Sequence, residues 1–113
     1  MATPDPLTLR SVELFLARVQ QRYPIVEAWL YGSRARGDGR EDSDVDLALV
    51  IGGEMTQPAS SIGAQMGADT IEALDKTGRF VSPLPIALAH WRDPSTHSNP
   101  FLLANIRREG IAL

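Results

Sequence analysis

The chain has 113 residues and a formal net charge of −3, from 11 basic and 14 acidic side chains. This length predicts a single domain, residues 1–113, with a thin core that uses most of the apolar residues. The absence of cysteine excludes disulfides, thiolate nucleophiles and metal sites with Cys ligands. The acidic balance argues against non-specific binding to nucleic acid. No stretch approaches the ~20 apolar residues of a membrane helix, and the N-terminus lacks a secretory signal, so we expect a cytoplasmic protein without a membrane contact.

Helical and strand patterns alternate along the chain. Apolar residues three or four apart predict helices, and runs of β-branched and aromatic residues bounded by Gly or Pro predict strands. The predicted elements are a helix over residues 7–22, a strand over 25–31, a loop over 32–43, a strand over 44–51, a helix over 58–78, a strand over 80–89, a loop over 90–98 and a helix over 99–108. Asp5 or Thr8 can cap the first helix. Pro83 and Pro85 place the third strand at a sheet edge, or confine its pairing to its C-terminal half. This order predicts an α/β (α+β) fold in which helices flank a small mixed β-sheet.

The helices each show a set of apolar residues that we expect to face the core. These residues are Val12, Phe15, Leu16 and Val19 in the first helix, Ile62, Met66, Ile71 and Leu74 in the second, and Phe101, Leu102 and Ile106 in the last. Trp29 and Trp91 are expected to pack in or around the core and not to form a base-stacking platform, because no basic groove accompanies them.

Acidic residues are concentrated at the start of the second predicted strand. The crowded residues are Asp38, Glu41, Asp42, Asp44 and Asp46. Residues two apart on a strand project from the same face, so Asp44 and Asp46 should lie side by side while Val45 and Leu47 face the other way. Adjacent carboxylates repel each other, and a divalent cation is a common reason for such a pair. A strand start exposed to water is the alternative.

The segment Gly32-Ser33 follows the first predicted strand. A glycine-containing turn between a strand and a helix exposes backbone N–H groups, which bind phosphate oxygens. A plain turn is the alternative. A phosphate-binding turn and an acidic pair together imply a polyphosphate bridged by a metal ion, and a nucleoside triphosphate with Mg²⁺ is the obvious ligand of that kind.

Gly32-Ser33, ten intervening residues and Asp44-Val45-Asp46 resemble the signature of the nucleotidyltransferase superfamily. The surrounding segments, Tyr-Gly-Ser-Arg-Ala-Arg-Gly and Ser-Asp-Val-Asp-Leu, resemble those of the minimal nucleotidyltransferases, or MNT domains. The resemblance implies the nucleotidyltransferase fold and transfer of a nucleoside monophosphate, commonly AMP from ATP, to a hydroxyl. It implies that Gly32 and Ser33 contact phosphate, and that Asp44 and Asp46 are the catalytic residues that ligate Mg²⁺.

The resemblance extends from the first predicted helix to Gly110, and residues 105–111 are similar to the closing helix of MNT proteins. Such proteins are frequently antitoxins encoded beside HEPN-domain toxins. The resemblance therefore suggests a HEPN-type toxin as the partner protein and a tyrosine hydroxyl of that toxin as the acceptor.

One feature departs from the family pattern. Active relatives usually carry a third carboxylate on the next core strand, where this chain has Ala87 or a near neighbour and no acid. The conceivable substitutes are His90, Asp93, Glu72 and Asp75.

The alternative function is therefore a catalytically weak or inactive module that binds nucleotide and metal and neutralises a partner by direct contact. A third option is a domain that acts on a small molecule or an RNA end, with the acceptor pocket completed by a partner chain or by a second copy in a homo-oligomer.

Arginines are abundant in the loop that follows the first strand. Arg34, Arg36 and Arg40 can each neutralise the charge of a triphosphate or pair with nearby acids at a wet surface. We take Arg36 as the nucleotide-binding candidate among them.

Overall fold

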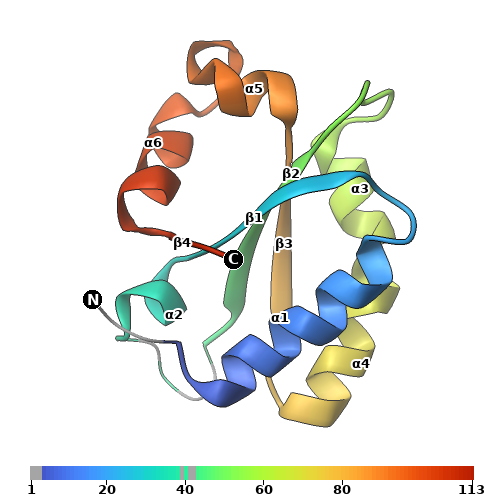
Figure 1. The fold of residues 1–113 in the computed structure, drawn as a ribbon, viewed down its shortest axis with the longest axis vertical. Coiled ribbons are helices and arrows are strands. Elements are labelled where there is room, and N and C mark those ends of the chain that lie inside the picture. Colours follow the sequence, from blue (N-terminus) through green and yellow to red (C-terminus); the bar gives the residue numbers. More distant parts are fainter. Residues whose placement is uncertain (1–3, 39, 41–42) are drawn as a thin grey trace.

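The computed structural model, described for residues 4–38, 40 and 43–113, contains a four-stranded sheet with helices on both faces (Figure 1). Its elements in chain order are α1 (Pro6–Val19), β1 (Ile25–Tyr31), α2 (Ser33–Arg36), β2 (Val45–Ile51), α3 (Ala59–Gln65), α4 (Gly67–Thr77), β3 (Val81–Ala87), α5 (Leu88–Arg92), a 3-10 helix (Pro94–Thr96), α6 (Pro100–Glu109) and β4 (Ile111–Ala112). The predicted mixed sheet flanked by helices is confirmed. Among the described residues, no helix combines the length and the apolar character needed to cross a bilayer.

The strands lie in the order β3-β2-β1-β4. β1 is antiparallel to both β2 and β4, whereas β2 and β3 are parallel. Parallel neighbours need a crossover connection, which α3 and α4 supply. The register places Tyr31 opposite Asp46, and Asp46 beside Ser82. The end of β1, the start of β2 and the start of β3 therefore meet at one end of the sheet.

Side chains of β2 alternate between two cores, as the sequence predicts. Val45, Leu47 and Leu49 belong to the core beneath α1, α3 and α4. Ala48 and Val50 belong to the core beneath α5 and α6. Because alternate residues share a face, Asp46 lies on the face that α6 covers.

The N-terminal helix begins at Pro6, one residue before the predicted start, and ends at Val19, three residues before the predicted end. The Asp5 carboxylate accepts hydrogen bonds from the backbone N–H of Thr8 at 2.9 Å and from its hydroxyl at 2.7 Å. Pro6 occupies the first turn, where a missing N–H costs nothing. Asp5 is therefore the cap, and Thr8 is its partner.

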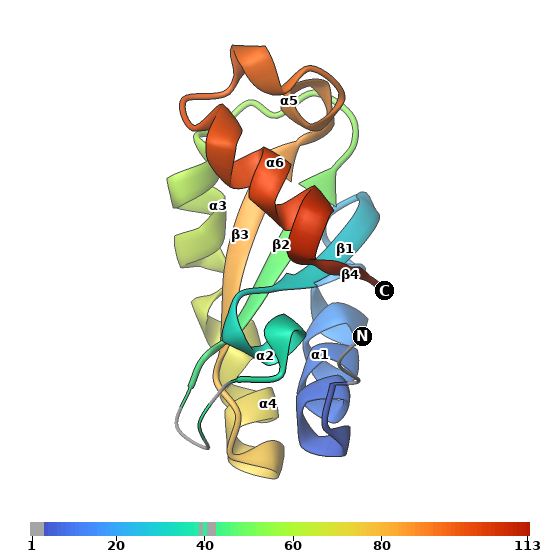
Figure 2. The ribbon, with the colours of Figure 1, turned by 90° about the vertical axis from the view of Figure 1, so that its left-hand side faces the viewer.

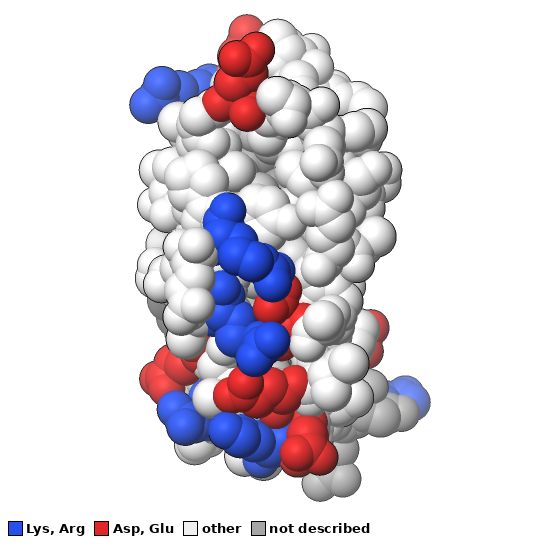
Figure 3. Space-filling view, turned by 90° about the vertical axis from the view of Figure 1, so that its right-hand side faces the viewer, with Lys and Arg blue, Asp and Glu red and all other residues white. Residues whose placement is uncertain are grey.

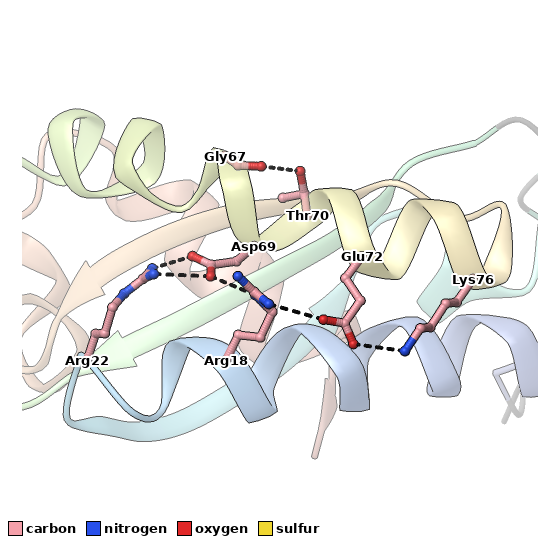
Figure 4. A network of polar contacts seen from close by, with 7 residues as sticks. All are labelled: Arg18, Arg22, Gly67, Asp69, Thr70, Glu72 and Lys76. Atoms are coloured by element: carbon pink, nitrogen blue, oxygen red, sulfur yellow. Dashed lines mark hydrogen bonds and ion pairs between the residues drawn. The ribbon is translucent and has the colours of Figure 1, made fainter.

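A buried carboxylate joins α1 to α4 (Figure 4). Asp69 is fully buried and pairs with Arg22 and with Arg18, whose Nε lies 3.1 Å from the carboxylate. Glu72 extends the network by pairing with Arg18 at 3.1 Å and with Lys76 at 3.2 Å. On the side that α3 and α4 occupy at the right of Figure 1, positive and negative side chains lie intermixed (Figure 3).

The prediction of one helix over residues 58–78 is wrong. The segment forms two helices that meet at Met66 and Gly67, where glycine's low helix propensity favours a break. Ile71 is 64% exposed and Leu74 is 43% exposed, although both were expected in the core. The buried residues of α4 are instead Asp69, Thr70, Ala73 and Thr77, and Asp69 pairs with Arg18 of α1 and with Arg22 after it.

The third strand lies at the edge of the sheet, as its prolines predict. Its pairing is not confined to the C-terminal half, because it runs from Val45–Val81 to Ile51–Ala87. Pro83 and Pro85 are two residues apart, so their positions without an N–H point the same way. Pairing with β2 then uses the intervening residues, which keep their N–H groups.

The C-terminal third differs from the prediction in three places. Residues 88–89, expected in the strand, begin α5, and the expected loop over 90–98 contains the rest of α5 and the 3-10 helix. Phe101 is 81% exposed, and Leu103 takes the buried position beside Ile106. β4 has two residues, too few to show any periodicity in the sequence.

Candidate active site

The turn after β1 brings the backbone of Gly32 against the side chain of Asp46. Gly32 has φ 74° and ψ −156°, a conformation that only glycine adopts readily. A Cβ at this position would overlap with Oδ2 of Asp46 and would lie 3.3 Å from its Cγ. Gly32 is therefore required both by its own backbone and by the close approach of the carboxylate.

Asp46 is a carboxylate in an environment that disfavours its charge. Burial raises the pKa of Asp46 above its usual value, the charge of Asp44 raises it further, and Arg36 acts in the opposite direction. Asp44 is exposed and directly precedes β2, so the strand begins one residue later than predicted. The two carboxylates nevertheless lie close enough for the charge of one to act on the other.

Tyr31 is a member of the site that the sequence analysis did not assign. Burial, and then the charge of Asp46, raise the pKa of Tyr31 to about 12. Its hydroxyl therefore stays protonated at neutral pH. The signal for this residue was its place directly before Gly32, but only the strand register shows that it stands opposite Asp46.

The helix after the turn is short, and its arginines have different roles. Ser33 opens α2, and its carbonyl accepts hydrogen bonds from the N–H groups of Gly37 and Asp38 at 2.9 and 3.2 Å. The Arg34 side chain is buried, donates to the carbonyl of Ser43 at 3.0 Å and lies 3.6 Å from Asp5. These contacts hold the loop and the first helix together, so Arg34 has a structural role.

Arg36 points towards the site while Arg40 contributes a backbone contact. Arg36 pairs with Asp38 at 3.3 Å and reaches Glu109 of α6 at 4.0 Å. The N–H of Arg40 donates to the Ser43 hydroxyl at 2.8 Å. Two other members of the predicted acidic cluster, at positions 41 and 42, lie outside the described residues. Of the three arginines, Arg36 is the one whose charge acts on Asp46.

A pocket of ≈ 180 Å³ adjoins these residues. Tyr31, Gly32 and Arg36 line one side, and the remaining lining residues all come from α6. These are Leu102, Asn105, Ile106 and Glu109. Three larger pockets among the described residues, of ≈ 550, ≈ 440 and ≈ 350 Å³, are lined by none of the residues predicted to bind phosphate or metal.

The place of the third carboxylate differs from the prediction. Ala87 pairs with Ile51, at the end of the sheet away from Asp46, so it is not the equivalent position. An acid that shared a metal ion with Asp46 would have to project from β3 beside it and on the same face, where the structure has Ser82 and then Leu84.

None of the conceivable substitutes lies at this end of the α6-covered face. His90 and Asp93 follow the far end of β3, where His90 Nδ1 lies 2.8 Å from the Thr96 hydroxyl and Asp93 accepts from Ser95. Glu72 and Asp75 belong to α4, which covers the opposite face. The acid pair thus has no third carboxylate among these four residues.

The donor set of the acid pair suits one small divalent cation. Mg²⁺ takes oxygen ligands, and proteins usually hold it through one or two carboxylates together with phosphate oxygens of the substrate. Asp44 and Asp46 supply two carboxylates of that kind. Over the described ranges, no group of three or more His, Asp or Glu residues is placed to hold an ion without a substrate. The site fits an ion that arrives with a polyphosphate.

The comparisons with known proteins agree with this geometry. A sequence model of the family described as “Nucleotidyltransferase domain” matches residues 12–88. A crystal structure from Sulfolobus solfataricus, named a “putative nucleotidyltransferase”, superposes with a TM-score of 0.51 at 17% identity, over 99% of this chain and 89% of that chain. At this identity the likeness shows the fold. No curated protein matches the chain. Since the family match spans the turn at Gly32 and both aspartates, the chain belongs to the nucleotidyltransferase domain family.

Proposed function

We propose that this chain binds a nucleoside triphosphate, ATP, together with Mg²⁺ and transfers the nucleoside monophosphate to a hydroxyl of a partner protein. Membership of the family supports nucleoside monophosphate transfer in general. The observation that carries the finer proposal is the contact between the Gly32 backbone and the Asp46 carboxylate. It puts the turn suited to phosphate beside the acids suited to a cation.

Each site residue has a physical role in this proposal. Gly32 and Ser33 contact the phosphates, and Arg36 neutralises part of their charge. Asp44 and Asp46 would hold Mg²⁺, which neutralises charge that develops on the phosphates during transfer. The acceptor oxygen bonds to the α-phosphorus, the bond to the β-phosphate oxygen breaks, pyrophosphate leaves and the hydroxyl proton passes to water.

The identity of the partner is proposed from the resemblance in sequence alone. The family motif resembles that of MNT antitoxins, so we propose a HEPN-type toxin as the acceptor protein, with a tyrosine hydroxyl as the acceptor group. The pocket of ≈ 180 Å³ beside Gly32 is too small for a nucleotide and an acceptor together. The acceptor surface would then come from the partner. A cytoplasmic location, where ATP and Mg²⁺ are present, is part of the same proposal.

A second candidate function follows from one observation. The residues of β3 beside Asp46 are Ser82 and Leu84, so the acid pair lacks a third carboxylate there. A site with two carboxylates can still bind a Mg²⁺-triphosphate while doing little to activate an attacking hydroxyl. The alternative is therefore a module that binds nucleotide and controls its partner by contact alone.

The experiment uses ATP labelled either at the α-phosphate or at the γ-phosphate, with Mg²⁺ and the protein encoded by the neighbouring gene as the proposed partner. Nucleotidyl transfer predicts that the partner acquires the α-label and not the γ-label. Calorimetry with Mg²⁺-ATP measures binding separately. Asp44→Asn and Asp46→Asn should abolish labelling, and Asp75→Asn, an exposed acid on α4, serves as the matched control.

Binding without α-labelling would refute catalysis and favour the second candidate. If the Asp44→Asn and Asp46→Asn variants still control the activity of the partner protein, that result would also favour the second candidate. Absence of Mg²⁺-ATP binding by a folded protein would refute both functions.

A further inference from the structure

We propose that the pocket between α6 and the end of β1 is the nucleobase subsite, and that Asn105 makes it select adenine. This inference rests on the proposed function, because it assigns a place to the base of the bound triphosphate. It concerns a helix that lies outside the residues matched by the family model.

The position of the pocket follows from the contacts around it. Tyr31 and Gly32 belong both to the pocket wall and to the surroundings of Asp46. Figure 2 shows α6 and α2 on the same side of the sheet, with the end of α6 above α2. Arg36 of α2 lies 4.0 Å from Glu109 of α6. A triphosphate bound at the turn therefore has this pocket beside it.

The size of the pocket limits what it can hold. Complete sites for small molecules enclose roughly 300–1,000 Å³, and this pocket has ≈ 180 Å³. It is large enough for one planar ring system and too small for a whole nucleotide. The phosphates would stay at the turn, outside the pocket, and only the base would enter.

The wall of the pocket combines apolar faces with one amide. Leu102, Ile106 and the ring of Tyr31 supply surfaces against which an aromatic base can pack. Asn105 is exposed, and its Oδ1 accepts a hydrogen bond from Nη2 of Arg108. An amide oxygen has two lone pairs, so Asn105 keeps one acceptor position and both N–H donors for a ligand.

These groups favour adenine over guanine. An asparagine amide pairs with adenine by accepting from the N6 amino group and donating to a ring nitrogen. Glu109 adds a carboxylate, which also accepts from an amino group and repels a carbonyl oxygen. Guanine presents a carbonyl oxygen at the corresponding position. The base that satisfies both side chains therefore carries an amino group at the position where guanine has its carbonyl oxygen, as adenine does.

The test separates the base from the phosphates. Mg²⁺-ATP, Mg²⁺-GTP and Mg²⁺-tripolyphosphate are titrated into the full chain and into Asn105→Ala, with tripolyphosphate as the probe that has no base. Loss of a hydrogen-bonded amide should weaken ATP binding about tenfold and leave tripolyphosphate binding unchanged. The preference for ATP over GTP should fall by the same factor. Alanine is a strong helix former, so the exposed position tolerates it.

Phe101→Ala is the matched control, because Phe101 lies on the same helix, is 81% exposed and does not line the pocket. It should bind all three ligands as the wild type does. Equal weakening of ATP and tripolyphosphate binding in Asn105→Ala would overturn the inference, since the residue would then act on the phosphate site. Unchanged ATP binding by Asn105→Ala would also overturn it, because the amide would then make no contact with the base. Failure of the wild type to bind any of the three would instead refute the proposed function.

Discussion

Replacing Gly32 by alanine tests the contact on which the site depends. The substitution adds one Cβ at a position where it would overlap with the Asp46 carboxylate. It also forces an L-residue into φ 74°, ψ −156°. Both effects act on the folded protein, so Gly32→Ala should lower the free energy of unfolding and displace Asp46 from its place.

The magnitude is the sum of two physical terms. A non-glycine residue in this backbone region costs about 1–3 kcal/mol. Crowding an extra carbon against a packed group costs about 1–3 kcal/mol more. We therefore expect Gly32→Ala to cost about 2–6 kcal/mol. Folded domains are generally stable by about 5–15 kcal/mol, so a loss of this size should be measurable.

Gly78→Ala is the control for a positive φ without crowding, although its ψ is 7° where that of Gly32 is −156°. Gly78 also has a positive φ, 72°, but a Cβ there would have no heavy atom within 4 Å. Its substitution should cost about 1–2 kcal/mol, the cost of the left-handed conformation alone. The assay is urea denaturation followed by tryptophan fluorescence, since Trp29 and Trp91 pack with ring centroids 5.5 Å apart and separate on unfolding.

A double-mutant cycle isolates the contact itself. In an Asp46→Ala background the obstructing carboxylate is gone, so Gly32→Ala should cost about 1–3 kcal/mol less than in the wild type. Equal costs in the two backgrounds would refute the proposed packing of the turn against Asp46. The same holds if Gly32→Ala costs no more than Gly78→Ala.

Two further predictions concern carboxylates. Asp69→Asn should lower the free energy of unfolding by about 2–4 kcal/mol, because a fully buried carboxylate loses its pairing with two arginines. Glu72→Gln removes a partly exposed ion pair and should cost less than about 1 kcal/mol. Similar urea midpoints for the two variants would contradict this. Burial and Asp44 raise the pKa of Asp46, so the folded state disfavours its carboxylate at neutral pH. Asp46→Asn should therefore stabilise the protein without ligand near neutral pH, and its advantage should shrink as the pH falls through the raised pKa; a pH-independent difference in melting temperature would contradict the assignment.

The sequence by itself identified the family and the local parts of the site. The spacing of Gly32-Ser33 and the aspartates is fixed by the covalent chain. The alternation along β2 gives each side chain a face wherever the strand is placed, because the period of a strand is two residues. The apolar core residues of α1 and its cap at Asp5 follow from equally short-range patterns.

The tertiary structure decided which segments meet and how each helix is turned. Asn105 lies some seventy positions from Gly32, and no local pattern indicates that α6 would close a pocket beside it. The orientation of α4 was predicted incorrectly, because the face that carries Asp69 and Ala73 is buried while Ile71 and Leu74 are exposed. Periodicity shows that a helix has two faces, but which face is buried depends on the partner surface. That partner is supplied by packing between residues far apart in the chain.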